Sequence, residues 1–484
     1  MKQNTRRFPV TCNAPALPPG NGSTAPSHLK ASAGIEYFKS SETNKKTTVK
    51  IATCISMHKY CLAIFCLGLL LNTPASFAQK TKNRHLHIPA VQSGNYPNLL
   101  IDAGYSEAAI NSKIEKAYHD LFEGPSRIYF ESGDSMAYVS DIKNHDARTE
   151  GLSYGMMVAV QLDKKEVFDR IWRWSKKYSQ HADGPSKGYF AWSINPVNLK
   201  KNSNGSASDG ELYFVTALLF AANRWGNNTG INYYSEARNI LDAMWSKDGT
   251  NGIHHIVNTE YKQISFTPER NNYNWTDPSY HLPAFFEIWA MYAKDGHEQF
   301  YKDCADTARA FLQRTCDAVT GLNPDYAEFS GAMHIAPWMP PGFRYDSWRV
   351  PMNIAMDYAW FGKDKAWQED YAKRIQRFFR SKGISTFEDQ FNTDGSTPAE
   401  ILQAGGYKKL RHSLGLVATV ATTAMITKDK KSFDFIHELW NAKLEPYEDG
   451  YFDPYYDGLL YLFSLMHLGG KYQIIKPYNT LTEK

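Results

Sequence analysis

The sequence predicts an all-α protein, an (α/α)6 toroid of six inner and six outer helices. From about Ser106 onward, apolar residues recur with helical periodicity and there is hardly any strand alternation. Segments that are apolar nearly all round alternate along the chain with amphipathic segments rich in charge. The first kind is typical of buried helices, and the second of helices that face solvent on one side.

Start and stop signals divide this region into twelve helices, of which the first is opened by a Ser cap. The segments 210–222 and 414–425 are examples of the apolar, inner kind, whereas 165–178 and 365–380 are amphipathic. In chain order, the predicted helices span 106–121, 153–162, 165–178, 208–225, 233–245, 278–294, 298–314, 346–361, 365–381, 411–426, 431–442 and 455–468.

A helical-repeat solenoid is the alternative to the toroid. The inner helices start at intervals of very roughly sixty residues, which is longer than common solenoid repeats. Loops of about fifteen to thirty residues precede many of them, and such long loops in a compact domain are usually functional. We therefore favour the toroid, with its long loops building one face.

The N-terminal region has the pattern of an export signal. A short basic region precedes an apolar run at 61–71, which is followed by small residues typical of a cleavage site that ends at Ala78. This run is too short to span a bilayer comfortably, and no cysteine follows it where lipidation would need one. We expect 57–78 to be a signal peptide, 1–56 to be disordered or untranslated, and 79–484 to be a single domain. The protein is then exported to the periplasm or the medium, without a membrane anchor, and we expect a monomer.

Charge argues against a nucleic-acid partner. The whole chain has a net charge of +4, but the segment 1–78 holds nine basic and two acidic residues. The remainder has 45 basic and 48 acidic residues, a net charge of −3, and no concentrated Lys/Arg stripe. Aromatic residues make up 14% of the chain, which fits either a large aromatic core or a cleft whose rings stack on sugars or bases.

Only two cysteines, Cys304 and Cys316, follow the predicted signal peptide. On a continuous helix their spacing places them about 18 Å apart, too far for a disulfide, so we expect free thiols. No Cys/His cluster has zinc spacing and no Gly-rich phosphate loop follows a strand signal, so we expect no metal and no cofactor.

Each predicted inner helix begins with a carboxylate, a His or a Tyr. If these helices run parallel around a ring, the groups converge at one end of the toroid. Helix capping explains some of them, because Asp and Ser are preferred N-caps, but it does not explain Glu150 or the interleaved Tyr and Trp. The helix starts read TEGLSYG at 149–155, SDGE at 208–211, DPSYH at 277–281, RYDSWR at 344–349, LRHS at 410–413 and DPYYDG at 453–458.

Converging carboxylates suit the hydrolysis of a glycosidic bond. That reaction needs one protonated carboxyl to donate to the leaving oxygen and one ionised carboxylate to activate water or attack carbon. The pKa of the donor must be raised by burial or by a neighbouring negative charge, while the base stays ionised.

Five segments resemble glycoside hydrolase family 8, and the similarity extends over nearly all of the chain after the signal peptide. The resemblance implies an (α/α)6 fold, hydrolysis with inversion of configuration, and no metal cofactor. The segments are TEGLSYGMM at 149–157, GYFAW at 188–192, SDGE at 208–211, PSYHLPAFF at 278–286 and YDSWRVP at 345–351.

The resemblance also implies roles for single residues. Glu150 matches the general acid of the family, and Asp346 matches the general base that deprotonates the attacking water. Asp209 matches a carboxylate that binds and distorts the sugar just before the cleaved bond. Tyr280 matches the residue that orients the water and the base, and Trp192 matches a ring on which a sugar stacks.

Three more residues at the starts of the inner helices are candidates for substrate binding. Arg349 follows Asp346 by one helical turn, and we expect it to pair with carboxylates. Tyr455 opens the sixth inner helix. His412 opens the fifth, and a similarity to the reducing-end xylose-releasing exo-oligoxylanases of the family implies that it closes the cleft one sugar beyond the cleavage point. The alternative for His412 is a helix-start histidine bonded to backbone.

The expected substrate is xylan or a xylo-oligosaccharide, from whose reducing end the enzyme releases xylose. An endo-acting xylanase or endoglucanase of the same family is the alternative. Two further classes stay open. A non-catalytic glycan-binding protein needs no acid–base pair, and a polysaccharide lyase needs uronic acid substrates and a more basic cleft.

Overall fold

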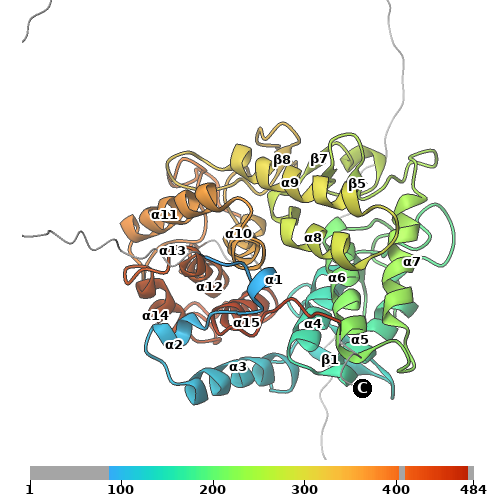
Figure 1. Ribbon diagram of the computed structural model, residues 1–484, viewed down its shortest axis with the longest axis horizontal. Helices are drawn as coiled ribbons and strands as arrows, with labels where there is room; N and C mark the ends of the chain where they lie inside the picture. Colours follow the sequence, from blue (N-terminus) through green and yellow to red (C-terminus); the bar gives the residue numbers. More distant parts are fainter. Residues whose placement is uncertain (1–86, 403–408, 478–484) are drawn as a thin grey trace, which may run out of the picture. The chain divides into compact units, whose positions relative to one another are not determined.

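A double ring of helices forms the described part of the protein, as the helical periodicity predicts (Figure 1). The computed structural model describes residues 87–402 and 409–477, which belong to one compact unit. The predicted signal peptide at 57–78 and the segment 1–56 lie outside the described residues. No helix within the described ranges is long and apolar enough to cross a membrane.

Six inner helices pack side by side around a closed ring, each against the next and the last against the first. Their residues are buried on almost every side, which is why their sequences are apolar nearly all round. The inner helices are α4 (Thr149–Gln161), α6 (Ser208–Trp225), α8 (Pro283–Tyr292), α10 (Arg349–Trp360), α12 (Leu414–Thr422) and α15 (Tyr456–Leu468).

Six outer helices each cover one inner helix: α5 covers α4, α7 covers α6, α9 covers α8, α11 covers α10, α14 covers α12, and α3 covers α15. Their buried residues follow one stripe, and charged residues occupy the solvent side. The outer helices are α3 (Glu107–Phe122), α5 (Lys165–Trp174), α7 (Tyr233–Trp245), α9 (Glu298–Thr315), α11 (Lys365–Ser381) and α14 (Phe433–Asn441). The prediction that Cys304 and Cys316 are free thiols is confirmed.

Four short antiparallel strand pairs, which the sequence pattern did not predict, join the loops around the ring. Strand β3 runs straight into α4, and at their junction the Thr149 N–H donates to the Trp192 carbonyl over 2.9 Å. The pairs are β1 (Tyr129–Ser132) with β2 (Met136–Val139), β3 (Ala147–Arg148) with β4 (Ser193–Ile194), β5 (Val257–Asn258) with β6 (Gln263–Ile264), and β7 (Trp275–Thr276) with β8 (Ala327–Glu328).

Four inner helices begin three or more residues from the predicted start. Helix α10 starts at Arg349 rather than at 346, because residues 346–348 form a 3₁₀ turn. Helix α4 starts at Thr149 rather than at 153, which places Glu150 in its first turn. Helix α8 starts at Pro283, because Pro fits the first helical position, and the preceding residues 278–280 form a separate 3₁₀ turn. Helix α12 starts at Leu414, so that His412 lies outside it. The described residues also form three shorter α-helices: α1 (Ala90–Ser93), α2 (Leu99–Asp102) and α13 (Ala424–Thr427).

A buried carboxyl stands behind the first turn of α6. Glu211 is fully buried, and its Oε1 accepts a hydrogen bond from the Phe190 N–H over 3.0 Å. Its Oε2 has no partner within the described ranges. Burial raises the pKa of Glu211 to about 8, so this carboxyl is protonated at neutral pH.

We expect Glu211→Gln to reduce the pH dependence of stability. The raised pKa means that the folded state holds a proton that the unfolded state releases, so stability falls as pH rises from about 5 to 8. Glutamine keeps the acceptor for Phe190 and removes this titration. Calorimetry should give similar melting temperatures for variant and wild type at pH 5, and a higher one for the variant at pH 8.5. The control is Glu107→Gln on the exposed surface of α3; an equal change there would contradict the assignment.

Candidate active site

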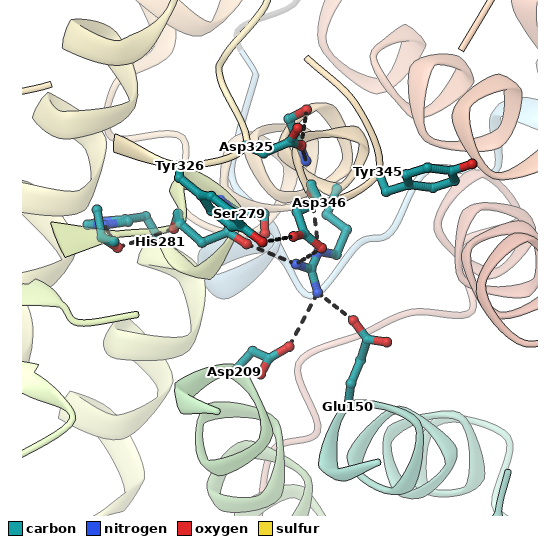
Figure 2. A network of polar contacts seen from close by, with 12 residues as sticks. Glu150, Asp209, Ser279, His281, Asp325, Tyr326, Tyr345 and Asp346 are labelled. Carbon is teal, nitrogen blue, oxygen red and sulfur yellow. Dashed lines mark hydrogen bonds and ion pairs between the residues drawn. The ribbon is translucent and has the colours of Figure 1, made fainter. Parts of the chain in front are cut away.

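Four carboxylates meet where the first four inner helices begin. Figure 2 labels three of them, Glu150, Asp209 and Asp346. Glu150 lies in the first turn of α4 and Asp209 in the first turn of α6. Asp277 caps the 3₁₀ turn before α8, and Asp346 begins the 3₁₀ turn that leads into α10. The convergence expected from parallel inner helices is therefore present for the first four of them.

The guanidinium of Arg349 holds all four carboxylates. Its Nη1 lies 2.7 Å from Glu150 Oε2 and 3.3 Å from Asp209 Oδ2. Its Nη2 lies 3.1 Å from Asp277 Oδ2 and 3.1 Å from Asp346 Oδ1. The side chain of Arg349 is only 4% exposed, so these pairs are little screened by water. Arg349 therefore pairs with carboxylates, as its position one helical turn after Asp346 predicted.

One cation cannot balance four negative charges, so protonation is favoured within the cluster. Burial raises the pKa of Glu150 to about 7; Arg349 opposes this shift, whereas Asp209 and Asp346 add to it. Burial also raises the pKa of Asp209 and that of Asp277. The N-terminus of α4 favours the ionised form of Glu150, but burial and the neighbouring carboxylates outweigh it.

Asp346 is held in place from three sides. Oδ1 contacts Arg349, and Oδ2 accepts a hydrogen bond from the Tyr326 hydroxyl over 3.3 Å. The turn that carries Asp346 is fixed by the buried Asp325, whose Oδ1 accepts from the backbone N–H and the hydroxyl of Ser347, both over 2.8 Å. Asp346 is 25% exposed, the most accessible of the four carboxylates, which suits a group that must meet water.

A cavity of about 470 Å³ opens over Glu150 and Asp346 on the side of Asp209. We call it the cleft cavity. Aromatic rings make up much of its lining, and rings of this kind hold the apolar faces of sugars. Its aromatic lining residues are Trp192, Phe266, Tyr280, Tyr326 and Trp338.

A second cavity, of about 350 Å³, lies on the other side of the same two carboxylates. We call it the inner cavity. Its wall is polar: the Lys143 ammonium donates to the Tyr451 hydroxyl over 2.6 Å and to Asp453 Oδ2 over 3.1 Å. Arg148, Glu150 and Asp346 line both cavities, so the two carboxylates stand at their junction.

Six of the eight residues predicted for the site line these cavities, and Arg349 lies directly behind them. Trp192, Asp209 and Tyr280 line the cleft cavity, and Tyr455 lines the inner cavity. No hydrogen bond joins Tyr280 to Asp346 within the described ranges; the Tyr326 hydroxyl occupies that position instead. Arg349 lines neither cavity and binds the carboxylates rather than open space.

His412 does not reach the cleft. Its Nδ1 is 2.9 Å from the Phe387 carbonyl and its Nε2 is 3.3 Å from Glu438 Oε1. It lines a separate surface cavity between α12 and α14. Because α12 starts two residues after His412, this side chain is turned toward the outer helix. Residues 403–408 of the preceding loop lie outside the described residues.

The sequence did not predict three residues that belong to the site: Asp277, Asp325 and Tyr326. Asp277 stood in a helix-start sequence, but its position before a Pro is explained by capping alone. Asp325 and Tyr326 lie in a long loop and have no periodic signal. The part of the chain that the structure describes holds no group of three or more His, Cys, Asp or Glu side chains arranged for a metal ion.

The motifs around these residues are those of a known family. The profile of glycosyl hydrolases family 8 matches residues 127–468, which include every element that brings a carboxylate to Arg349. The chain belongs to glycosyl hydrolases family 8. It is therefore a glycoside hydrolase.

Within family 8, similar curated proteins act on xylo-oligosaccharides according to their names. The reducing-end xylose-releasing exo-oligoxylanase Rex8A of Paenibacillus barcinonensis is 38% identical over 392 residues, 80% of this chain and 98% of that enzyme. The reducing end xylose-releasing exo-oligoxylanase of Halalkalibacterium halodurans is 38% identical over 399 residues, 80% of this chain and 96% of that enzyme. A solved structure of Rex8A with xylose has a TM-score of 0.72 at 36% identity, covering 80% of this chain and 100% of that one.

We expect Asp209→Asn to move the alkaline limb of the pH–activity profile to lower pH. If Glu150 is the general acid, activity is lost as pH rises through the pKa of its carboxyl. Removing the negative charge of Asp209 removes one of the causes that raise the pKa of Glu150. Burial and Asp346 still raise this pKa, whereas Arg349 and Arg148 lower it, so the pKa should fall but stay above its ordinary value. The measurement is kcat/KM from pH 5 to 9 on a soluble xylo-oligosaccharide. A limb that stays in place, or moves to higher pH, would contradict this electrostatic account.

Proposed function

We propose that this protein is an exported, inverting glycoside hydrolase that releases xylose from the reducing end of xylo-oligosaccharides. One observation supports the proposal most directly: Glu150 and Asp346 stand together at the junction of two cavities of unequal size. The names of the similar family 8 proteins supply the substrate. The leader pattern that ends at Ala78 supports export.

The proposed acid is Glu150 and the proposed base is Asp346. A protonated Glu150 gives its proton to the glycosidic oxygen as the bond from that oxygen to the anomeric carbon breaks. Asp346 takes a proton from a water molecule, whose oxygen forms the new bond to the same carbon from the opposite face. Inverting enzymes need room for this water, and their two carboxyl groups are about 6.5–9.5 Å apart. The binding of Glu150 and Asp346 to different nitrogens of Arg349 is consistent with such a separation.

The two cavities divide the substrate between them. Asp209 lines only the cleft cavity, so the sugar before the cleaved bond and the rest of the chain belong there. Trp192 and Trp338 offer the rings for stacking. The leaving sugar then occupies the smaller, inner cavity.

The wall of the inner cavity supports release of a single sugar. Lys143, Tyr451 and Asp453 are joined by hydrogen bonds opposite the acid–base pair. These groups offer both donors and acceptors to the hydroxyls of one xylose, including its anomeric hydroxyl. We propose this polar wall, rather than His412, as the group that limits the leaving side.

We expect Glu150→Gln and Asp346→Asn each to lower kcat by several orders of magnitude while the fold is retained. Each substitution keeps the shape of the side chain and removes the proton transfer that the mechanism requires. Turnover on xylotriose and melting temperature are the two measurements. Proton NMR of the wild-type reaction should show the xylobiose product first as its α-anomer. Near-wild-type kcat in either variant would remove that residue from the mechanism, and xylobiose formed first as its β-anomer would exclude inversion.

End selectivity is tested with xylohexaose that carries an isotopic label at its reducing end. We expect labelled xylose and unlabelled xylopentaose as the first products, because the inner cavity accepts one sugar. Lys143→Ala should allow longer labelled products, while His412→Ala, the matched control from the separate cavity, should leave the products unchanged. Early mixed xylotriose and xylotetraose from the wild type would instead indicate endo action.

A further inference from the structure

A third cavity lies outside both parts of the candidate active site. With a volume of about 870 Å³ it is larger than the cleft cavity. It extends between the end of α7, the β5–β6 hairpin and the residues after β8, a region near the labels α7, β5 and β8 in Figure 1. We call it the outer cavity. Its lining residues are Lys247, Asp248, His254, His255, 258–261, Tyr273, Asn274 and 328–330.

The outer cavity and the cleft cavity share one wall. Asn272 lines the cleft cavity, whereas the next two residues, Tyr273 and Asn274, line the outer cavity. The strand pair β7–β8 continues this wall, with Trp275 opposite Glu328. Trp275 stacks on Phe266 of the cleft with ring centroids 4.1 Å apart. The segment 272–274 therefore borders both cavities.

An exposed aromatic ring forms part of the outer cavity. Tyr261, at the tip of the β5–β6 hairpin, is 51% exposed. Its ring lies beside that of the buried Phe329, with centroids 5.2 Å apart, and is tilted against it by 36°. The hairpin tip is fixed by Asn258, whose Oδ1 accepts from the N–H groups of Glu260 and Tyr261, both over 3.1 Å. The ring of Tyr261 is therefore accessible to a ligand, and the hairpin that carries it is held by hydrogen bonds.

Polar side chains, some of them without hydrogen-bond partners among the described residues, also line the outer cavity. The side chains of Asn274 and Glu260 are exposed and make no hydrogen bond to any described residue. The lining includes the carboxylates of Asp248, Glu260 and Glu328 against the single ammonium of Lys247. Donors and acceptors around an aromatic ring fit the hydroxyls and the apolar face of a sugar, and the excess of carboxylates disfavours acidic sugars.

We propose that the outer cavity binds the distal, non-reducing part of longer, uncharged xylo-oligosaccharides whose reducing end occupies the candidate active site. This inference rests on the proposed function, because it needs a chain that enters from the cleft cavity. Tyr261 is its stacking residue, and Asn274 supplies hydrogen bonds. The site raises affinity for long chains and takes no part in the chemical step.

The test compares Tyr261→Ala and Asn274→Ala with wild type on xylotriose and xylohexaose. Both side chains are exposed, so the fold should be retained. For Tyr261→Ala we expect a several-fold higher KM on xylohexaose, the same KM on xylotriose, and an unchanged kcat on both. Asn274→Ala should change KM in the same direction by a smaller factor.

Two controls sharpen the comparison. Trp338→Ala removes a ring of similar exposure, 52%, that lines the cleft cavity, and should raise KM on both substrates. Val319→Ala, at a 72% exposed position outside all three cavities, should change neither.

The two proposals fail in different ways. Failure of the wild type to cleave xylotriose or xylohexaose would overturn the proposed function. Cleavage with an unchanged KM for Tyr261→Ala at both lengths, or with an equal rise at both, would overturn the distal site alone. Titration of xylohexaose into the inactive Glu150→Gln protein gives a second measurement, in which adding Tyr261→Ala should weaken binding several-fold; unchanged binding would contradict the distal site.

Discussion

The site depends on the ion cluster around Arg349. Four carboxylates, two from the first turns of inner helices and two from the 3₁₀ turns before inner helices, lie within 3.3 Å of one buried guanidinium. Without that cation, the negative charges of neighbouring carboxylates would repel each other strongly in a medium of low dielectric constant. With it, the carboxylates can stay close, but they remain in excess, so protonation is shared among them. The raised pKa of Glu150 follows from this imbalance together with burial.

The cluster also explains two glycines in the family motifs. A Cβ on Gly210 would lie 2.6 Å from the Cβ of Thr149, at the point where α6 crosses the start of α4. A Cβ on Gly151 would overlap the ring of Tyr455 from the start of α15. Real Cβ atoms do not approach other atoms so closely, so only glycine permits these helix starts to meet. The same close approach brings Glu150 and Asp209 to a single nitrogen of Arg349.

The elements with a strong periodic signal could be predicted from the sequence, and those fixed by tertiary contacts could not. Among the described residues, all twelve long helices overlap the segments that periodicity predicted, because burial on one side or on every side leaves a pattern, although several of their starts differ. The two-residue strands leave none, since β3 and β7 exist only through pairing with distant loops.

The same limit applies within the site. Asp346 and Arg349 are one turn apart in sequence, and their contact could be predicted from that spacing. Asp325 acts from a loop 22 residues before Ser347, and nothing in the local sequence indicates that contact. The start of α12 at Leu414 likewise decides the direction of His412, and its difference of three residues from the predicted start is within the usual error of a predicted helix boundary.

Position, more than pKa, distinguishes the proposed acid from its neighbours. Asp277 also has a raised pKa, but its side chain is fully buried and lines neither cavity beside the cluster. Asp209 lines only the cleft cavity. Among the four carboxylates around Arg349, only Glu150 and Asp346 line both cavities, so only they can reach both sides of a bond that spans the junction.

Of these two, Glu150 is the more deeply buried, with 17% of its side chain exposed against 25% for Asp346. Since burial favours the protonated form, this difference supports our proposal that Glu150, rather than Asp346, is the acid.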